Sequence, residues 1–569
     1  MGTRGLEIVR FRGRYYIRYN QYDSYYEGLG AEIIAKIPAD PEEYQKWLEK
    51  MRAEYADKQK ELEDHVYEIR DSSKPDYSYF KGLMALPSEL PRLTSHDAEY
   101  FYIINLDREV LTMNFSIHWK LGHIPRSDDL WLKAIAESIY RFKPTISLDI
   151  CPDEYIAPPA LELPKPIPEL GYCYRVVAPK TEITEAREVF LTRILAEVLI
   201  QYKDDIVGLG MEWSPDSFPF RELVFALVSI ASGMTKFFSF PARSCNPRGC
   251  EWWDCKSKHM PKSCGFLNKD WAGSHAPLLE FGSMSHRPGD APGVSPPETR
   301  YWIEDVLVSL TMRTDGEAVT QAVDWGIGQG RENFQVVVLS LFKVTFVEVT
   351  WAEDEGAEPM VKVSEPLDLS PLRRSYCMST HPRERPELKD GMDYQRQRGE
   401  AIMGTNCTGK PRRLNSQFPG LSALVKFFEV AAMRRVASKS AGILPLELYE
   451  RILDFVDYDT WKTCTSVSTE FRSSCLRKYR IDDETRLLPR PFVRLQKNHK
   501  QPLLSFEFEN MKTGEVFPTI QTPRISSTKK LNWMPIIGSD RKALMLDVVV
   551  QFEPAEDIPA EDDNDDGSI

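Results

Sequence analysis

Residues 444–472 read LPLELYERILDFVDYDTWKTCTSVSTEFR and form the most strongly patterned stretch of this 569-residue chain. Pro445 stands where a first helix begins, a position at which its missing N–H costs nothing. The apolar positions of that helix fall on one face: Leu448, Ile452, Leu453 and Val456. Asp457 and Asp459 are candidate N-caps of a second helix. Its apolar positions recur every three or four residues: Trp461, Cys464, Val467 and Phe471. Two such short helices cannot bury both apolar faces alone, so they must pack on a third helix or on a partner.

This pattern resembles the F-box, the helical module that docks substrate receptors onto the Skp-type adaptor of cullin–RING ubiquitin ligases. The general pattern L-P-x-E-L-x-x-x-I-L-x-x-L/V-D, then L, V and F/W, is matched without a gap at these positions: Leu444, Pro445, Glu447, Leu448, Ile452, Leu453, Val456, Asp457, Val467 and Phe471. Trp461 replaces the usual leucine, and Cys464 takes a position that is normally larger and aliphatic.

The resemblance implies that Leu444 and Pro445 contact the adaptor directly. It also implies which residues build the helical pack: Leu448, Ile452, Leu453, Trp461 and Val467. Together with Phe471, these residues are the candidate partner-binding set. The implied function is a non-catalytic adaptor that binds the Skp-type subunit and presents an unknown target protein for ubiquitin transfer.

Two other hypotheses stay open. The chain could be a structural or ligand-binding protein whose F-box-like helices are only scaffold. It could also be an enzyme that uses its Tyr- and Arg-rich N-terminus. We find no HExxH, no G-x-S-x-G and no kinase signature, so the sequence favours a protein without catalytic activity.

A cysteine-rich loop at residues 243–264 holds the candidate metal ligands: Cys245, Cys250, Cys255, His259 and Cys264. Thiolates and imidazole suit tetrahedral zinc, and four of these five residues would fill a structural site. The tight C-x2-C spacing is absent, however, and reduced cysteines without metal are the alternative. No other cofactor is expected.

Charge and hydropathy exclude several classes of protein. The formal net charge is −13, and eight acidic residues without a basic one lie between Glu553 and Asp566. This balance argues against a general nucleic-acid binder, because phosphate contacts need a basic surface. The longest apolar run, Leu223–Ala231, is far shorter than the roughly 20 residues of a membrane span. The N-terminus has no apolar signal segment, so we expect a cytoplasmic or nuclear protein.

The N-terminal residues predict a β-hairpin with strands at Leu6–Phe11 and Arg14–Tyr19 and a turn at Arg12. Aromatic and arginine residues alternate here, as in platforms that bind single-stranded nucleic acid. A strand pair with one buried face and outward arginines is the favoured interpretation. The segments MGTRG and YNQYDSYYEGLG also resemble the start of a group of uncharacterised fungal proteins, with Tyr26 replacing a proline. That resemblance implies no activity.

The expected fold class is α+β and multidomain. From the N-terminus we predict the following regions: an α+β domain at 1–150, with a helix around Leu130–Tyr140; a Pro-rich linker at 151–182; a helical and β body at 183–370; a flexible basic linker at 371–419; an F-box-like helical module at 420–480; a small β-rich region at 481–553; and an acidic disordered tail at 554–569.

Overall fold

The computed structural model describes residues 2–369 and 415–552. Within these ranges it leaves out residues 13, 72–97, 115–116, 137–144, 148–149, 158–169, 203–205, 207–214, 217, 242–294, 352–357, 439–442, 490–493, 496–502, 523–530 and 537–548. Three predicted regions therefore lie outside the described residues: the cysteine-rich loop, nearly all of the basic linker and the acidic tail. The described part combines helices with mixed sheets, which confirms the α+β prediction.

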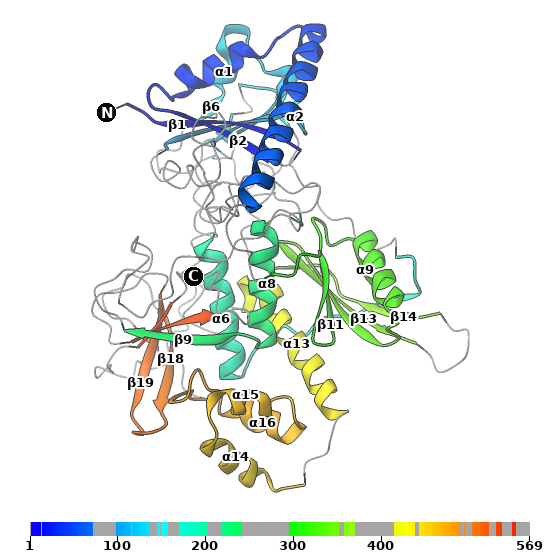
Figure 1. Cartoon of the computed structure of the whole chain (residues 1–569), viewed down its shortest axis with the longest axis vertical. Coiled ribbons are helices and arrows are strands. Elements are labelled where there is room, and N and C mark those ends of the chain that lie inside the picture. The colour runs from blue at the N-terminus through cyan, green and yellow to red at the C-terminus, as the bar shows by residue number, and fades with distance from the viewer. Residues whose placement is uncertain are drawn as a thin grey trace.

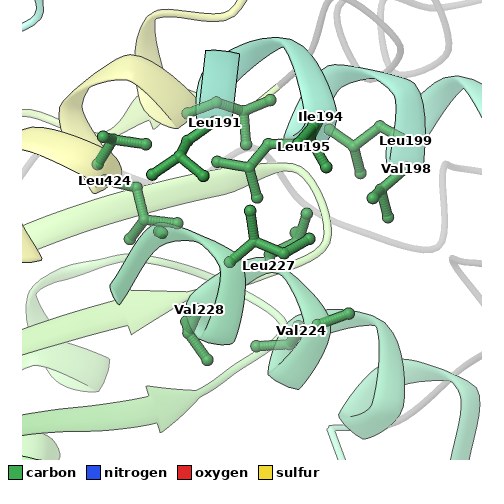
Figure 2. Packing of buried hydrophobic residues seen from close by; sticks show 14 of the residues in the cluster. Leu191, Ile194, Leu195, Val198, Leu199, Val224, Leu227, Val228 and Leu424 are labelled. Carbon is green, nitrogen blue, oxygen red and sulfur yellow. The ribbon is translucent and has the colours of Figure 1, made fainter. Parts of the chain in front are cut away.

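Three apolar helices lie at the centre of the molecule: α6 (Ala186–Gln201), α8 (Phe218–Ser232) and α13 (Pro419–Ala437) (Figure 1). The apolar side chains of α6 recur every three or four residues and are buried, among them Leu191 and Leu195. Figure 2 shows these leucines meeting Leu227 of α8 and Leu424 of α13 between the helices. Although α13 falls in the predicted module at 420–480, it packs mainly on α6 and α8 and so belongs to the body.

The N-terminal sheet has the order β2-β1-β3-β4-β5, in which only β1 and β3 are parallel. Its strands are β1 (Gly5–Phe11), β2 (Arg14–Asn20), β3 (Tyr100–Asn105), β4 (Val110–Met113) and β5 (Ile117–Lys120). The predicted hairpin is confirmed, and Arg12 takes the positive φ of its turn. Helices α1 (Ala31–Lys36) and α2 (Pro41–Asp71) cover one face, and Asp40 caps α2.

Both faces of this hairpin are buried, so the prediction of a single buried face was wrong. Val9 and Phe11 pack in the cluster that holds α1 and α2, whereas Leu6 and Ile8 join the cluster of the central helices. The predicted helix around Leu130–Tyr140 is also shorter than expected. Helix α5 (Leu130–Lys133) ends because the chain turns into β6 (Ile135–Ala136), which pairs with β7 (Thr145–Ile146).

The middle sheet has the order β10-β11-β12-β13-β14-β8, with β15 paired to β13. Its strands are β10 (Arg300–Ile303), β11 (Val306–Leu310), β12 (Phe334–Leu339), β13 (Lys343–Thr350), β14 (Met360–Val363), β8 (Tyr174–Val176) and β15 (Leu367–Asp368). One face packs on α9 (Gly316–Gly328) and the other on α13. Strand β8 lies within the predicted Pro-rich linker, so that part of the linker is instead a sheet edge, parallel to β14.

The C-terminal sheet has the order β16-β18-β19-β21-β20-β9, with β17 paired to β18. Its strands are β16 (Thr485–Leu487), β17 (Arg494–Leu495), β18 (Leu503–Asn510), β19 (Val516–Thr522), β20 (Leu531–Ile536), β21 (Val549–Phe552) and β9 (Lys236–Pro241). Strand β9 comes from the middle of the chain and pairs with β20. The rings of Phe237, Phe506 and Phe508 surround Phe190 of α6, with centroids 5.7, 5.3 and 5.7 Å away. The C-terminal β-region therefore shares its core with the central helices.

The chain before residue 371 and the chain after residue 414 should stay together when the connection between them is cut. A protease site inserted after residue 390 tests this, because α13 packs on α6 and α8 while β9 pairs with β20. We expect the two fragments to co-elute in native buffer and to separate only in denaturant. Separation in native buffer would show that the two parts fold apart.

Candidate partner-binding site

The stretch 444–472 forms three helices rather than two: α14 (Leu446–Phe455), α15 (Tyr458–Cys464) and α16 (Thr469–Arg477), here called the helical module. The side chain of Asp457 accepts a hydrogen bond from the Thr460 amide, which confirms it as the cap of α15. The predicted second helix is divided because Ser468 caps a new helix and accepts from the Phe471 amide. Pro445 stands at the N-cap of α14, as its position in the sequence suggested.

One face of the helical module is part of the body's core. Leu453 and Trp461 of the candidate set are buried, at 1% and 2% exposure. The ring of Trp461 contacts Tyr479, which in turn contacts Phe190 of α6. Phe471 is partly buried and packs edge-on against Tyr449, with ring centroids 4.6 Å apart. These residues fix the module to the body.

The opposite face exposes a row of apolar side chains. Leu444, Leu448, Ile452 and Phe455, here called the outer row, are 42%, 44%, 40% and 89% exposed. Pro445 is also exposed, and Val467 is 43% exposed. The resemblance implied that Leu448, Ile452 and Val467 build the helical pack, which is not what we find. The inward side of α14 is instead formed by Tyr449 and Leu453, one residue further along the helix.

A buried ion triad joins the helical module to the body. Glu429 of α13 accepts hydrogen bonds from Arg187 of α6 at 2.9 Å and from Arg472 of α16 at 2.9 Å on both oxygens. The two arginine side chains are 6% exposed and the glutamate 14%. Burial alone would raise the pKa of Glu429, but the two guanidinium groups outweigh it and lower the pKa below its ordinary value. The stabilisation is therefore complete at neutral pH and is lost as the pH falls through that lowered pKa.

Replacing Glu429 with glutamine should destabilise the whole protein, because two buried guanidinium groups would lose their counter-charge. We expect a loss of about 3–5 kcal/mol in the free energy of unfolding, measured with urea. Glu450→Gln is the matched control, since Glu450 pairs with the exposed Arg477 and its loss should cost about 1 kcal/mol or less. Equal losses in the two variants would contradict the role given to the triad.

A second contact joins α15 to the loop before β9. The ammonium of Lys462 donates to the carbonyl of Thr235 at 2.8 Å, and neighbouring Lys236 pairs with Asp459. Burial, together with the positive charge of Lys236, lowers the pKa of Lys462 to about 8. This amine therefore titrates near physiological pH, far below an ordinary lysine.

Lys462 should make stability depend on pH in the weakly alkaline range. Between about pH 8 and the ordinary lysine pKa near 10.5, the unfolded chain keeps the proton that the folded chain has released. Between pH 7.5 and 9.5 the free energy of unfolding should thus rise by about 2 kcal/mol more in the parent than in Lys462→Met. Urea titrations at pH 7.5, 8.5 and 9.5 measure this difference. Parallel pH curves for the two proteins would contradict it.

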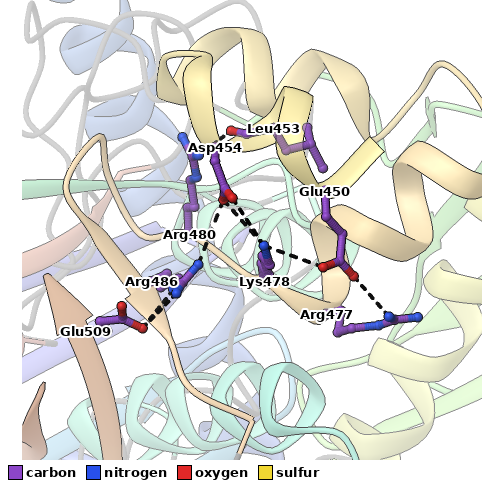
Figure 3. A network of polar contacts seen from close by, with 8 residues as sticks. All are labelled: Glu450, Leu453, Asp454, Arg477, Lys478, Arg480, Arg486 and Glu509. Carbon is purple, nitrogen blue, oxygen red and sulfur yellow. Dashed lines mark hydrogen bonds and ion pairs between the residues drawn. The ribbon is translucent and has the colours of Figure 1, made fainter. Parts of the chain in front are cut away.

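A surface network holds α14 against the end of α16 and the chain that follows it (Figure 3). Glu450 pairs with Arg477 at 2.9 Å, and Asp454 pairs with Lys478 at 3.3 Å. Arg480 donates to the carbonyl oxygens of Leu453 and Val456, which end α14. These contacts occupy the side of α14 next to the body and leave the outer row uncovered by them.

The described residues provide no support for the other candidate sites. The five candidate zinc ligands lie outside the described residues, and among the described residues no group of three or more His, Cys, Asp or Glu could hold a metal. N-terminal arginines pair with acids nearby: Arg10 with Asp107, in the turn between β3 and β4, at 2.6 Å, and Arg18 with Glu7 of β1 at 3.4 Å. No described helix is long and apolar enough to cross a membrane.

Sequence reasoning missed three residues that define this site: Glu429, Lys462 and Phe455. Glu429 is the one charged residue in FFEVAAM, residues 427–433, and a charge in such an apolar stretch of helix is a signal for a buried ion pair. Lys462 carries no comparable signal, because its partner Thr235 is remote in sequence. Comparisons of the chain with family models, with curated proteins and with solved structures give no match.

Proposed function

We propose that the chain is an F-box-type adaptor, which docks a target protein onto a Skp–cullin–RING ubiquitin ligase through residues 444–472. One observation carries this proposal: the stretch that resembles the F-box divides into an anchored face and an exposed apolar face. Leu453 and Trp461 are buried against the body, while Leu444, Leu448 and Ile452 are exposed together. Contiguous exposed apolar side chains are typical of binding surfaces.

The exposed face suits helix-in-groove recognition. In such complexes a few apolar side chains at helical spacing enter a groove on the partner and supply most of the affinity. Leu448 and Ile452 are four residues apart, so they lie on one side of α14. Pro445 fixes the entry of the chain into this helix. The ligase complex would supply the chemistry, so this chain needs no active site for the proposed role.

The rigid mounting of the helical module also fits the role. An adaptor must hold its target at a fixed position relative to the ligase, and a module that shares its core with the body does so without a hinge. The buried triad of Arg187, Glu429 and Arg472 provides this rigidity. The unknown target would be bound by the body, most of which precedes the helical module in the chain.

A second candidate function is a structural or ligand-binding protein in which the three helices are only scaffold. The shared core favours it, because Trp461 packs through Tyr479 onto Phe190 just as an ordinary body helix would. Exposure of the outer row favours the adaptor hypothesis over the scaffold hypothesis, because a purely structural role does not require exposed leucines. Native mass spectrometry of the full chain would reveal a bound small molecule under this second hypothesis.

Binding of the full chain to a purified Skp-type adaptor tests the proposal. We expect the parent to bind and the double variant Leu444→Ala, Pro445→Ala to bind at least about tenfold more weakly, since it removes exposed anchors. Met360→Ala is the matched control, because Met360 is 42% exposed on β14, in the middle sheet. Isothermal titration calorimetry measures affinity, and circular dichroism confirms the fold of each variant. A folded parent that does not bind the adaptor would refute the proposal.

A further inference from the structure

Two highly exposed apolar side chains are next to, but not among, the positions that match the F-box pattern. Ile443 directly precedes Leu444 and is 95% exposed, and Phe455 ends α14 and is 89% exposed. Within the described part of the chain, no other large apolar side chain is as exposed as these two. Leu444, Leu448 and Ile452, which lie between them, are about half as exposed.

Helix geometry places Phe455 in line with Leu448 and Ile452. At about 100° per residue, Phe455 lies roughly 20° from Leu448 around the helix axis, and Ile452 lies roughly 40° from Leu448 in the other direction. The inward residues Tyr449 and Leu453 lie about 100–140° from Leu448. A rise of about 1.5 Å per residue puts Phe455 about 10 Å beyond Leu448 along α14. Phe455 therefore extends the exposed row by almost one helical turn.

The charges around Phe455 indicate what kind of partner could cover it. The exposed charged residues next to it in the sequence are of both signs: Arg451, Asp454, Asp457 and Asp459, of which Asp454 pairs with Lys478 and Asp459 with Lys236. This mixed surrounding lacks the cluster of basic residues that anionic lipid surfaces attract. An aromatic side chain within a row of leucine and isoleucine is typical of an anchor that fills a pocket in a protein partner. The occupant that these features fit is a protein with an apolar groove.

We propose that Phe455 is a further partner-contact residue, which inserts into an apolar pocket of the Skp-type adaptor beyond the region that Leu448 and Ile452 occupy. Ile443 contacts the adaptor at the other end of the groove. This inference rests on the proposed function and adds to it: the adaptor also contacts side chains that the F-box pattern does not specify, and a pocket for the aromatic ring of Phe455 contributes to partner choice.

The test compares the full-length parent with Phe455→Ala, Phe455→Leu, Ile443→Ala and the control Met360→Ala in titrations against the purified adaptor. Phe455 is almost fully exposed, so its truncation should leave the thermal unfolding midpoint unchanged. We expect Phe455→Ala to weaken binding about tenfold or more, Phe455→Leu to lie between it and the parent, and Met360→Ala to match the parent. Ile443→Ala should weaken binding by a smaller factor.

The outcomes separate this inference from the proposed function. If the parent binds and Phe455→Ala binds equally well, the inference is wrong while the proposed function stands. If the folded parent does not bind, both are wrong. Sedimentation velocity of the parent alone addresses another occupant: self-association that Phe455→Ala abolishes, with unchanged adaptor binding, would assign the pocket to a second copy of this chain and overturn the inference.

Discussion

The arrangement of this protein depends on one buried carboxylate, that of Glu429, which lies between the guanidinium groups of Arg187 and Arg472. These residues belong to α6, α13 and α16, which are far apart in the chain. Each charge would be costly to bury alone, so the three helices are stable only when they come together. The triad thereby specifies how the helical module sits on the central helices. The aromatic chain from Trp461 through Tyr479 to Phe190 reinforces the same junction.

The inner face of the helical module packs against the body, so only its outer face is available to a partner. α14 shows the division most clearly: Tyr449 and Leu453 point into the protein, while Leu448 and Ile452 are exposed one residue earlier. Arg480 and Lys478 hold α14 from the body side and keep this orientation. The function proposed for the chain follows from this division, because a docking helix must be held from one side and open on the other.

Local patterns in the sequence predicted local structure well. The apolar spacing after Pro445 identified α14, and the alternation around Arg12 identified the first hairpin. Non-local pairing could not be predicted, because strands β9 and β20 are joined across almost three hundred residues. The orientation of α14 could not be predicted either. Its apolar residues span two adjacent sides of the helix, and only contact with the body decides which side is buried. The exposure of the candidate site could therefore be seen only in the folded chain.

Hydrogen exchange of the whole protein, with and without the purified Skp-type adaptor, tests the central claim most directly. In the free protein, amides of α16 should exchange as slowly as those of α6, because Arg472 and Arg187 share one buried carboxylate. Addition of the adaptor should slow exchange in residues 443–456 and leave α6 unchanged. Fast exchange of α16 in the free protein, or unchanged exchange in residues 443–456 at saturating adaptor, would contradict the account.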